Sequence, residues 1–307
     1  MKYVITGATS FIGLELTRHL IGTGNEVCAV CRKGSVAQGN IPAGARKVYA
    51  EMAEYGQLHE LVGGADVFIN LAWEGTGHKG RDIKDVQQEN IHSTLCAIDS
   101  AQAMGCQVFV EAGSQAEYGT VTDTITEETP CAPFSEYGKA KLEVKVQGFL
   151  RCAAIGMKYI HLRIFSVYGE DDHPWTLVMS ALDKMLRNET VDLSPCTQNW
   201  NFIYVKDAAR QIAALCEYAC RNSGFRQEVF NIASTDTRTL KDFVEQMKHL
   251  AHSESTLNFG AVTPAHLVSL QPDVTKLTAA TRLNTFTPFD EVIQNIIKAK
   301  AKKVIRL

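Results

Sequence analysis

The stretch Tyr3-Val4-Ile5-Thr6-Gly7-Ala8-Thr9-Ser10-Phe11-Ile12-Gly13 decides the fold of this 307-residue chain. Its first four residues form an apolar, β-branched run typical of a strand, and residues 11–21 have the apolar spacing of a helix. Gly7 permits a tight turn between them, and Gly13 lets the helix pack closely on the strand. Because N–H groups at the start of such a helix bind phosphate, the stretch predicts a dinucleotide site. The alternative is a tight turn that binds no ligand.

The loop residues that we expect to contact the dinucleotide are Gly7, Thr9, Ser10, Phe11, Ile12 and Gly13. Ser10 replaces the middle glycine of the motif; it narrows the space for a phosphate and offers it a hydroxyl. After the next predicted strand, an acid would bind a ribose 2′-hydroxyl and an arginine would accommodate a 2′-phosphate. Arg32 and Lys33 stand there, and no acid follows before Glu51. We therefore favour NADP(H) over NAD(H) as the cofactor.

Short apolar runs alternate with longer amphipathic stretches along the first two thirds of the chain. The predicted strands are residues 3–6, 26–31, 47–50, 66–71, 107–112 and 159–165, and the longest predicted helices are 82–104 and 135–155. This alternation predicts an α/β fold: a doubly wound parallel sheet (Rossmann) with a smaller C-terminal substrate-binding lobe. We assign residues 1–169 and about 200–235 to the dinucleotide-binding domain, and about 170–199 and 236–307 to the lobe.

The composition excludes several classes of protein. The 31 basic and 34 acidic residues are interspersed, so we expect no nucleic-acid partner. No apolar run is long enough to span a bilayer and no secretory signal is evident, so we expect no membrane partner and a cytoplasmic location. Nine cysteines without such a signal indicate reduced thiols. Cys28 and Cys31 form a C-x-x-C inside a predicted strand without a second ligand pair, so we expect no metal site.

Three residues suggest acid–base chemistry at the carboxyl edge of the sheet. Tyr137 and Lys141 are four apart on one face of a predicted helix, where an ammonium can lie near the phenol and lower its pKa. A tyrosine of this kind can exchange a proton at neutral pH. Ser114 follows the fifth predicted strand, and its hydroxyl can bind the oxygen that Tyr137 protonates.

Together these motifs resemble the extended short-chain dehydrogenases, the NAD-dependent epimerase/dehydratase family, most of whose members act on nucleotide sugars. The resemblance spans residues 1 to about 209. It rests on the loop at Gly7, Asn70-Leu71-Ala72, Asn90, Ser114 with Tyr118-Gly119, Tyr137 with Lys141, and the segments 163–169 and 202–207.

The resemblance implies a role for each matching residue. Tyr137 is the acid/base, Lys141 binds the nicotinamide ribose and lowers the pKa of Tyr137, and Ser114 orients the substrate oxygen. The residues implied to line the cofactor are Leu71, Ala72 and Phe165. Ser166 occupies a position where a substrate-contacting asparagine is common. The resemblance also implies a homodimer built on the long helices before and after Ser114.

Departures from the family pattern narrow the predicted reaction. Gln115 and Ala116 stand where sugar dehydratases carry an Asp-Glu pair, so the second acid and base that water elimination needs are missing. Glu117 comes one residue too late to replace them, and we expect it to bind nearby backbone; Gln115 is a predicted substrate contact. Since Arg32 and Lys33 favour NADPH, we predict a reductase of a 4-keto-6-deoxy sugar nucleotide. The alternatives are an NAD-dependent nucleotide-sugar 4-epimerase and a non-catalytic protein that senses NADP.

A second departure concerns the substrate diphosphate. Many relatives place an arginine before the Phe/Tyr-Ile-x-Val segment, whereas Trp200 stands there in this chain. Trp200 is a predicted substrate contact that can stack on a base or sugar, with a core position as the alternative. Further candidates, each with a surface position as the alternative, are Lys184, Arg187 and Lys276 for the diphosphate, and His173 and Trp175 for the substrate.

Overall fold

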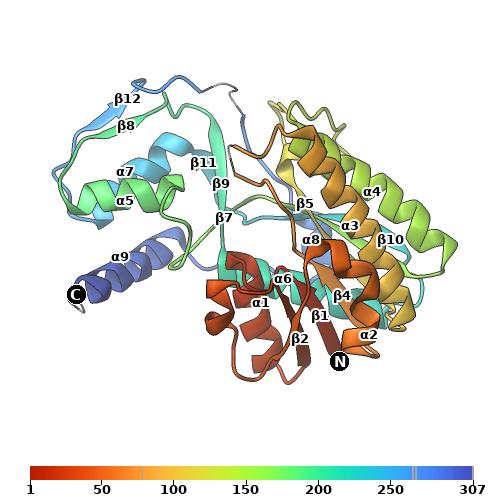
Figure 1. The fold of residues 1–307 in the computed structure, drawn as a ribbon. Coiled ribbons are helices and arrows are strands. Elements are labelled where there is room, and N and C mark those ends of the chain that lie inside the picture. The colour runs from red at the N-terminus through yellow and green to blue at the C-terminus, as the bar shows by residue number, and fades with distance from the viewer. Residues whose placement is uncertain (78, 265, 267, 306–307) are drawn as a thin grey trace.

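A seven-stranded parallel sheet forms the centre of the computed structural model, which describes residues 1–77, 79–264, 266 and 268–305 (Figure 1). The strand order is β10-β6-β5-β4-β1-β2-β3. The strands are β1 (Lys2–Thr6), β2 (Glu26–Cys31), β3 (Arg46–Tyr49), β4 (Val67–Asn70), β5 (Val108–Ser114), β6 (Lys158–Ile164) and β10 (Gln227–Ile232). The predicted doubly wound fold is confirmed. Every pairing in this sheet is parallel, so the carboxyl ends of its strands share one edge.

Helices cover both faces of this sheet, which explains why its strands are apolar at consecutive positions. Tyr3 and Ile5 of β1 pack into one buried cluster, whereas Val4 between them packs into another. The first cluster includes residues of α1 (Phe11–Gly22), α6 (Val205–Arg221) and α8 (Thr275–Thr281). The second includes residues of α2 (Leu58–Val62), α3 (Lys84–Ala103) and α4 (Glu136–Ala154).

A smaller lobe lies beside the carboxyl edge of the sheet (Figure 1). It contains the sheet β11-β9-β7 and the pair β12-β8. Its strands are β7 (Ser166–Tyr168), β8 (Val191–Leu193), β9 (Asn199–Tyr204), β11 (Thr237–Thr239) and β12 (Leu257–Phe259), and its helices are α5 (Leu177–Leu186), α7 (Leu240–Leu250) and α9 (Phe289–Ile305). Three elements cross the predicted boundaries: β7 and β9 pair within the small sheet, and α8 packs on α6 and β10. The division into domains stays a prediction.

All nine cysteines are free thiols. Cys28 and Cys31 are buried in clusters on opposite faces of β2, so the C-x-x-C does not form a ligand pair. In the described ranges no cluster of three or more His, Cys, Asp or Glu side chains is arranged to hold a metal ion. The helices described here are also too short or too polar to cross a bilayer.

Candidate active site

The loop between β1 and α1 has the close packing that the sequence predicts. Gly7 adopts a positive φ of 64°. A Cβ atom on Gly7 would lie 2.8 Å from the backbone nitrogen of Ala72, and one on Gly13 would lie 2.3 Å from the carbonyl oxygen of Gly7. Glycine is therefore required at both positions. Ala72 follows β4 and lies directly against the loop.

Ser10 is the N-cap of α1. Its Oγ accepts a hydrogen bond from the backbone nitrogen of Gly13 at 3.1 Å, and its carbonyl oxygen accepts one from Leu14 at 2.9 Å. This local role accounts for the serine that replaces the middle glycine. The N–H groups of Phe11 and Ile12, in the first turn of α1, have no acceptor within the helix, and they suit the pyrophosphate of a dinucleotide. The residues present thus fit the predicted cofactor.

The two cations after β2 differ in what they contact. Both Arg32 and Lys33 are exposed. Lys33 donates from Nζ to Glu54 at 3.0 Å and from its backbone nitrogen to Glu51 at 3.1 Å. The backbone nitrogen of Glu51 and the Lys33 ammonium together lower the pKa of Glu54. None of the ion pairs found among the described residues involves Arg32, so Arg32 is the better placed of the two for a 2′-phosphate.

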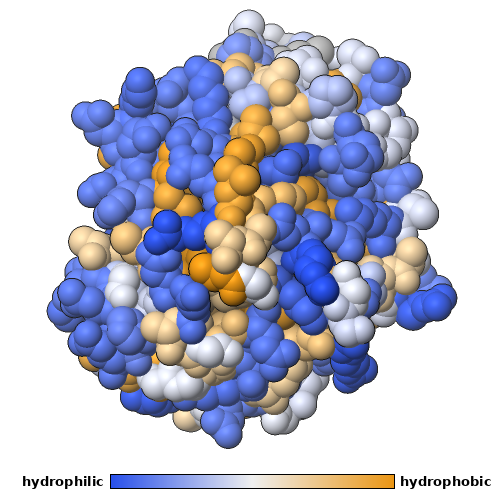
Figure 2. Space-filling model, turned by 90° about the vertical axis from the view of Figure 1, so that its right-hand side faces the viewer, coloured by the Kyte–Doolittle hydropathy of each residue, from blue (hydrophilic) through white to orange (hydrophobic). Residues whose placement is uncertain are grey.

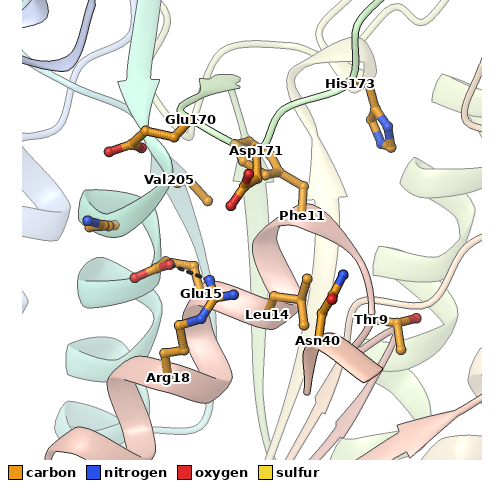
Figure 3. A pocket seen from close by; sticks show the side chains of 11 residues that line it. Thr9, Phe11, Leu14, Glu15, Arg18, Asn40, Glu170, Asp171, His173 and Val205 are labelled. Atoms are coloured by element: carbon orange, nitrogen blue, oxygen red, sulfur yellow. Dashed lines mark hydrogen bonds and ion pairs between the residues drawn. The ribbon is translucent and has the colours of Figure 1, made fainter. Parts of the chain in front are cut away.

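A cavity of about 880 Å³ adjoins the phosphate loop (Figure 3). It lies between the loop, α1, the first turn of α6 and the segment after β7. Its lining residues are Thr9, Phe11, Leu14, Glu15, Arg18, Asn40, Glu170, Asp171, His173, Val205 and Lys206. Two predicted cofactor residues, Thr9 and Phe11, therefore face open space.

Ser114 is the last residue of β5, two residues beyond the predicted end of that strand. Its Oγ caps the short helix η3 (Gln115–Glu117) by accepting from Ala116 at 3.1 Å, and its backbone nitrogen donates to the Glu117 carboxylate at 2.8 Å. The side chain also hydrogen-bonds the phenol of Tyr137. The structure thus brings Ser114 and Tyr137 together, as the sequence predicts.

Glu117 holds the backbone of Ser114 in place. It is fully buried and accepts from His161 Nε2 at 2.9 Å and from Arg163 Nε at 3.0 Å. Burial alone would raise the pKa of Glu117, but His161, Arg163 and the Ser114 backbone hold that pKa below its usual value. Glu117 does bind nearby backbone, as expected, and it also holds the side chains of His161 and Arg163 on β6.

Lys141 of α4 is enclosed on three sides by groups that attract its ammonium. Nζ donates to the carbonyl oxygen of Ala112 at 2.5 Å, lies 3.4 Å from Oε1 of Glu111, and lies 3.4 Å from the ring centroid of Trp73. Both partners of the ion pair are buried. Burial lowers the pKa of Lys141 to about 8, although Glu111 opposes this change.

The predicted effect of Lys141 on the pKa of Tyr137 stays a prediction. Nζ lies 6.0 Å from the ring centroid of Tyr137 and is directed at Glu111 on the neighbouring strand. Burial raises the pKa of Tyr137, and the hydrogen bond from Ser114 and the charge of Arg81 only partly offset this rise. In the chain by itself the phenol is therefore protonated at neutral pH.

Sequence reasoning missed Glu111, which joins Lys141 to the phosphate loop. Nδ2 of Asn70 donates to Oε2 of Glu111 at 2.7 Å, and Oγ1 of Thr6 donates to Oδ1 of Asn70 at 2.5 Å. These buried side chains come from β1, β4, β5 and α4 and form one chain of contacts. The available signal was an acidic residue inside an otherwise apolar strand, because such a residue needs a buried partner.

Sequence reasoning also missed Arg81 in the loop between β4 and α3. Its guanidinium carbon lies 4.5 Å from the ring centroid of Tyr137, and its carbonyl oxygen accepts from the backbone nitrogen of Tyr137 at 2.8 Å. Trp73, in the same loop, meets the Tyr137 ring edge-on at 6.1 Å. Tyr137, in the first turn of α4, therefore packs against a loop that has no regular hydrophobic pattern.

The remaining predicted residues lie in different surroundings. Leu71 follows β4, Phe165 is buried between β6 and β7 against Tyr118, and Ser166 and Gln115 are half-buried. Trp200 packs on Phe202 and contacts two apolar clusters, which favours the core interpretation. Of the other candidates, Arg187 pairs with Glu189, Lys276 pairs with Glu228, and His173 stacks on the exposed Trp175.

Residues 3–233 match the family described as the NAD dependent epimerase/dehydratase family. The chain belongs to this family. This match confirms the predicted family. It also confirms the prediction that the chain is an enzyme of this family. The parallel sheet, the glycine loop at Gly7 and the pair Ser114 and Tyr137 all lie within the matched segment.

Similar family members include two enzymes of deoxysugar nucleotides. The dTDP-6-deoxy-L-talose 4-dehydrogenase (NAD(+)) of Aggregatibacter actinomycetemcomitans is 26% identical over 80% of this chain and 89% of its own length. The dTDP-4-dehydro-6-deoxyglucose reductase of Escherichia coli is 23% identical over 79% of this chain and 78% of its own length. Among solved structures, a UDP-glucose 4-epimerase from Thermotoga maritima with UDP-glucose has a TM-score of 0.87 and 20% identity, over 99% of this chain and 100% of that one. The similarity to this solved structure shows the fold alone.

Proposed function

We propose that the chain is an NADP(H)-dependent oxidoreductase that reduces the keto group of a nucleotide-activated 4-keto-6-deoxy sugar. The contact between Ser114 and Tyr137 at the carboxyl edge of β5 carries this proposal, because it places two hydroxyl groups where one carbonyl oxygen can meet both. The two relatives named for dTDP-deoxysugar reactions support the substrate class.

The chain's own residues supply the proton and hold the reactants. Ser114 donates a hydrogen bond to the substrate carbonyl oxygen, and Tyr137 transfers its phenolic proton to that oxygen. Lys141 would hold the nicotinamide ribose of the bound cofactor. When bound, the nicotinamide supplies the hydride that completes the reduction.

Reduction needs a proton donor at the substrate oxygen, and Tyr137 beside Ser114 is the group proposed to supply it. A 4-epimerase would use the same two hydroxyl groups, so the choice of a reductase rests on the proposed NADP(H) preference and on the relatives named for deoxysugar reactions. Gln115 and Ala116 supply no second acid and base, so dehydration is not proposed.

The preference for NADP(H) rests on Arg32. Its exposed guanidinium follows β2, and no ion pair among the described residues involves it. Lys33, in contrast, is paired with Glu54. The A. actinomycetemcomitans relative is named for NAD(+), so the preference of this chain is the more specific part of the proposal. A cytoplasmic location and the absence of a nucleic-acid partner stay predictions.

The same proposal includes a homodimer. Val146 and Leu150 on α4 are 48% and 69% exposed, which is unusual for large apolar side chains on a helix of a soluble enzyme. Apolar side chains gather in a band on the face shown in Figure 2, the side of the molecule on which α3 and α4 lie in Figure 1. We expect Leu150→Glu to convert a dimer into a monomer in analytical ultracentrifugation, with Lys139→Glu, an exposed position on the same helix, as control. A wild-type monomer would contradict the dimer.

A panel of nucleotide 4-keto sugars tests the reaction. The purified protein is incubated with each sugar nucleotide and either NADPH or NADH, and cofactor oxidation is compared with the amount of reduced sugar. We expect equimolar oxidation of NADPH. Protein that retains NAD(H) through purification and interconverts sugar epimers without consuming cofactor would replace this proposal with the 4-epimerase.

A further inference from the structure

Ser114 and Glu117 form a capping box around η3, although this helix has only three residues. Oγ of Ser114 accepts from the backbone nitrogen of Ala116 at 3.1 Å, and the Glu117 carboxylate accepts from the backbone nitrogen of Ser114 at 2.8 Å. These two contacts fix both the backbone and the side chain of Ser114. The hydroxyl hydrogen of Ser114 is not used by the cap, so it is left to donate to an oxygen outside η3.

The carboxylate of this capping box is buried more deeply than capping requires. Glu117 is fully buried, and a carboxylate in such a place needs charged or hydrogen-bonded partners. His161 Nε2 lies 2.9 Å from Oε1 of Glu117, and Arg163 Nε lies 3.0 Å from Oε2. His161 and Arg163 are alternate residues of β6, so both side chains point to the same face of the sheet. Two buried polar side chains of one strand therefore converge on one carboxylate.

Gly113 leaves the space that this cluster occupies. A Cβ atom on Gly113 would lie 2.6 Å from Oε1 of Glu117 and closer still to Nε2 of His161. The φ of Gly113 is not positive, so backbone conformation does not require glycine there. The carboxylate and the imidazole require it. The residue directly before Ser114 is thus also fitted to Glu117.

Arg163 connects the cluster to the segment that leads from η3 to α4. Nη1 of Arg163 donates to the carbonyl oxygen of Glu127 at 3.0 Å, and Nη2 contacts Sγ of Cys131 at 3.0 Å. The segment enters α4 at Ser135, which is the N-cap of that helix. One buried guanidinium therefore joins Glu117 to the chain just before the helix that carries Tyr137.

The first turn of α4 packs directly on η3. A Cβ atom on Gly138 would lie 2.6 Å from the carbonyl oxygen of Ala116, so the two backbones are in close contact. Gly138 follows Tyr137, and Ala116 lies two residues after Ser114. The position of η3 therefore determines how the hydroxyl of Ser114 meets the phenol of Tyr137.

We propose that Glu117 is a positioning residue for the reaction: with His161 and Arg163 as its buried partners, it holds η3 and the Ser114 backbone so that the Ser114 hydroxyl meets the substrate oxygen beside Tyr137. Glu117 touches neither substrate nor cofactor in this scheme and acts only through Ser114. The inference rests on the proposed role of Ser114.

A double-mutant cycle between Glu117 and Ser114 tests this. Glu117→Asp keeps the negative charge beside Arg163 but shortens the side chain by one methylene, so the carboxylate no longer reaches the Ser114 backbone in the same way. A misplacement of about 1 Å can cost about 100-fold in rate, so we expect kcat to fall by about 10- to 100-fold with little change in KM for the sugar nucleotide. Ser114→Ala should lower kcat by about 100- to 1,000-fold, and adding Glu117→Asp to it should lower kcat no further. A purely structural role would lower kcat by the same factor in both backgrounds.

Glu128→Asp is the matched control, because it makes the same chemical change at an exposed position between η3 and α4, and kcat should be unchanged. Urea unfolding shows whether each variant is folded under the assay conditions. If Glu117→Asp does not fold, the same cycle is run with two variants of His161. His161→Leu removes the donor to Glu117, whereas His161→Gln supplies an amide donor in its place, so His161→Gln should keep more of kcat than His161→Leu.

The cycle uses whichever reaction the wild type catalyses, NADPH oxidation or the interconversion of sugar epimers, because both would use Ser114. Amide hydrogen exchange, read by mass spectrometry on peptides that contain Ser114, needs neither substrate nor cofactor. Glu117→Asp should speed exchange in these peptides, since the acceptor of the Ser114 N–H is moved.

Three results would overturn the proposal: a wild-type kcat in Glu117→Asp, an equal loss of kcat in the presence and absence of the Ser114 hydroxyl, or unchanged exchange in the Ser114 peptides. If exchange is faster but the wild type catalyses neither reaction, the proposed function fails and the placement of Ser114 by Glu117 stands.

Discussion

The substitution Glu111→Gln isolates the charge that holds Lys141. Glutamine keeps the shape of the side chain, and its amide can still contact Asn70, but the ion pair at 3.4 Å is lost. Both partners are buried, so water does not replace the missing charge. The first consequence is a change in the pKa of Lys141.

The size of this change follows from the geometry. An opposite charge within about 4 Å shifts a pKa by about 1 to 3 units. In the wild type the pKa of Lys141 is already lowered by burial to about 8, so the variant value should lie between about 5 and 7. In unfolded protein the lysine titrates near 10.4. Between the variant pKa and 8, wild-type Lys141 is protonated in the folded state whereas variant Lys141 is not.

The sign of the pH effect is then fixed. Between the variant pKa and pH 8, the folded variant binds fewer protons than the folded wild type. In that pH range the free energy of unfolding of the variant rises with pH relative to that of the wild type, by about 1.4 kcal/mol per pH unit at most. The variant should therefore be less stable than the wild type at pH 7, and this deficit should shrink by about 1 kcal/mol by about pH 9, where Lys141 is neutral in both folded proteins, and stay constant above that pH.

Urea unfolding of both proteins between pH 6 and about pH 9 measures this deficit. Glu143→Gln is the matched control, because it makes the same chemical change at an exposed position of α4, and its deficit should not depend on pH. A deficit for Glu111→Gln that is independent of pH between 7 and 9 would refute the ion pair as the group that holds Lys141 charged.

Two further predictions concern the cofactor. Gly13→Ala should abolish dinucleotide binding in calorimetry and lower the urea midpoint, because the added Cβ would lie 2.3 Å from the Gly7 carbonyl oxygen. Gly22→Ala, where the added Cβ meets open space, should change neither quantity. Normal dinucleotide binding by Gly13→Ala would contradict the packing of the loop. Arg32→Gln should weaken NADPH binding by about 10- to 100-fold, as expected for one charge-assisted phosphate contact, and leave NADH binding unchanged in a fluorescence titration. Equal effects on the two cofactors would remove the case for NADP(H).

Much of the fold is predictable because the parallel strands are buried on both faces and appear as apolar runs. The glycine loop and the spacing of Tyr137 and Lys141 are local features, so they too are visible in the sequence. The direction of the Lys141 side chain is not, because Glu111 determines it from a strand 30 residues away. Arg81 lies in a loop without periodicity, where only the folded backbone brings it onto Tyr137. The role of Ser10 depends on a cap geometry that the glycine pattern alone does not specify.

The central claim is that Tyr137 supplies the proton for a net reduction by NADPH. The most direct test measures NADPH oxidation and NADPH binding in the wild type and in Tyr137→Phe, with a nucleotide 4-keto-6-deoxy sugar as substrate. We predict equimolar oxidation by the wild type, and in Tyr137→Phe a fall in kcat of about 100- to 10,000-fold with NADPH affinity retained. A variant that still reduces the sugar at the wild-type rate, or a wild type that consumes no NADPH, would contradict the account.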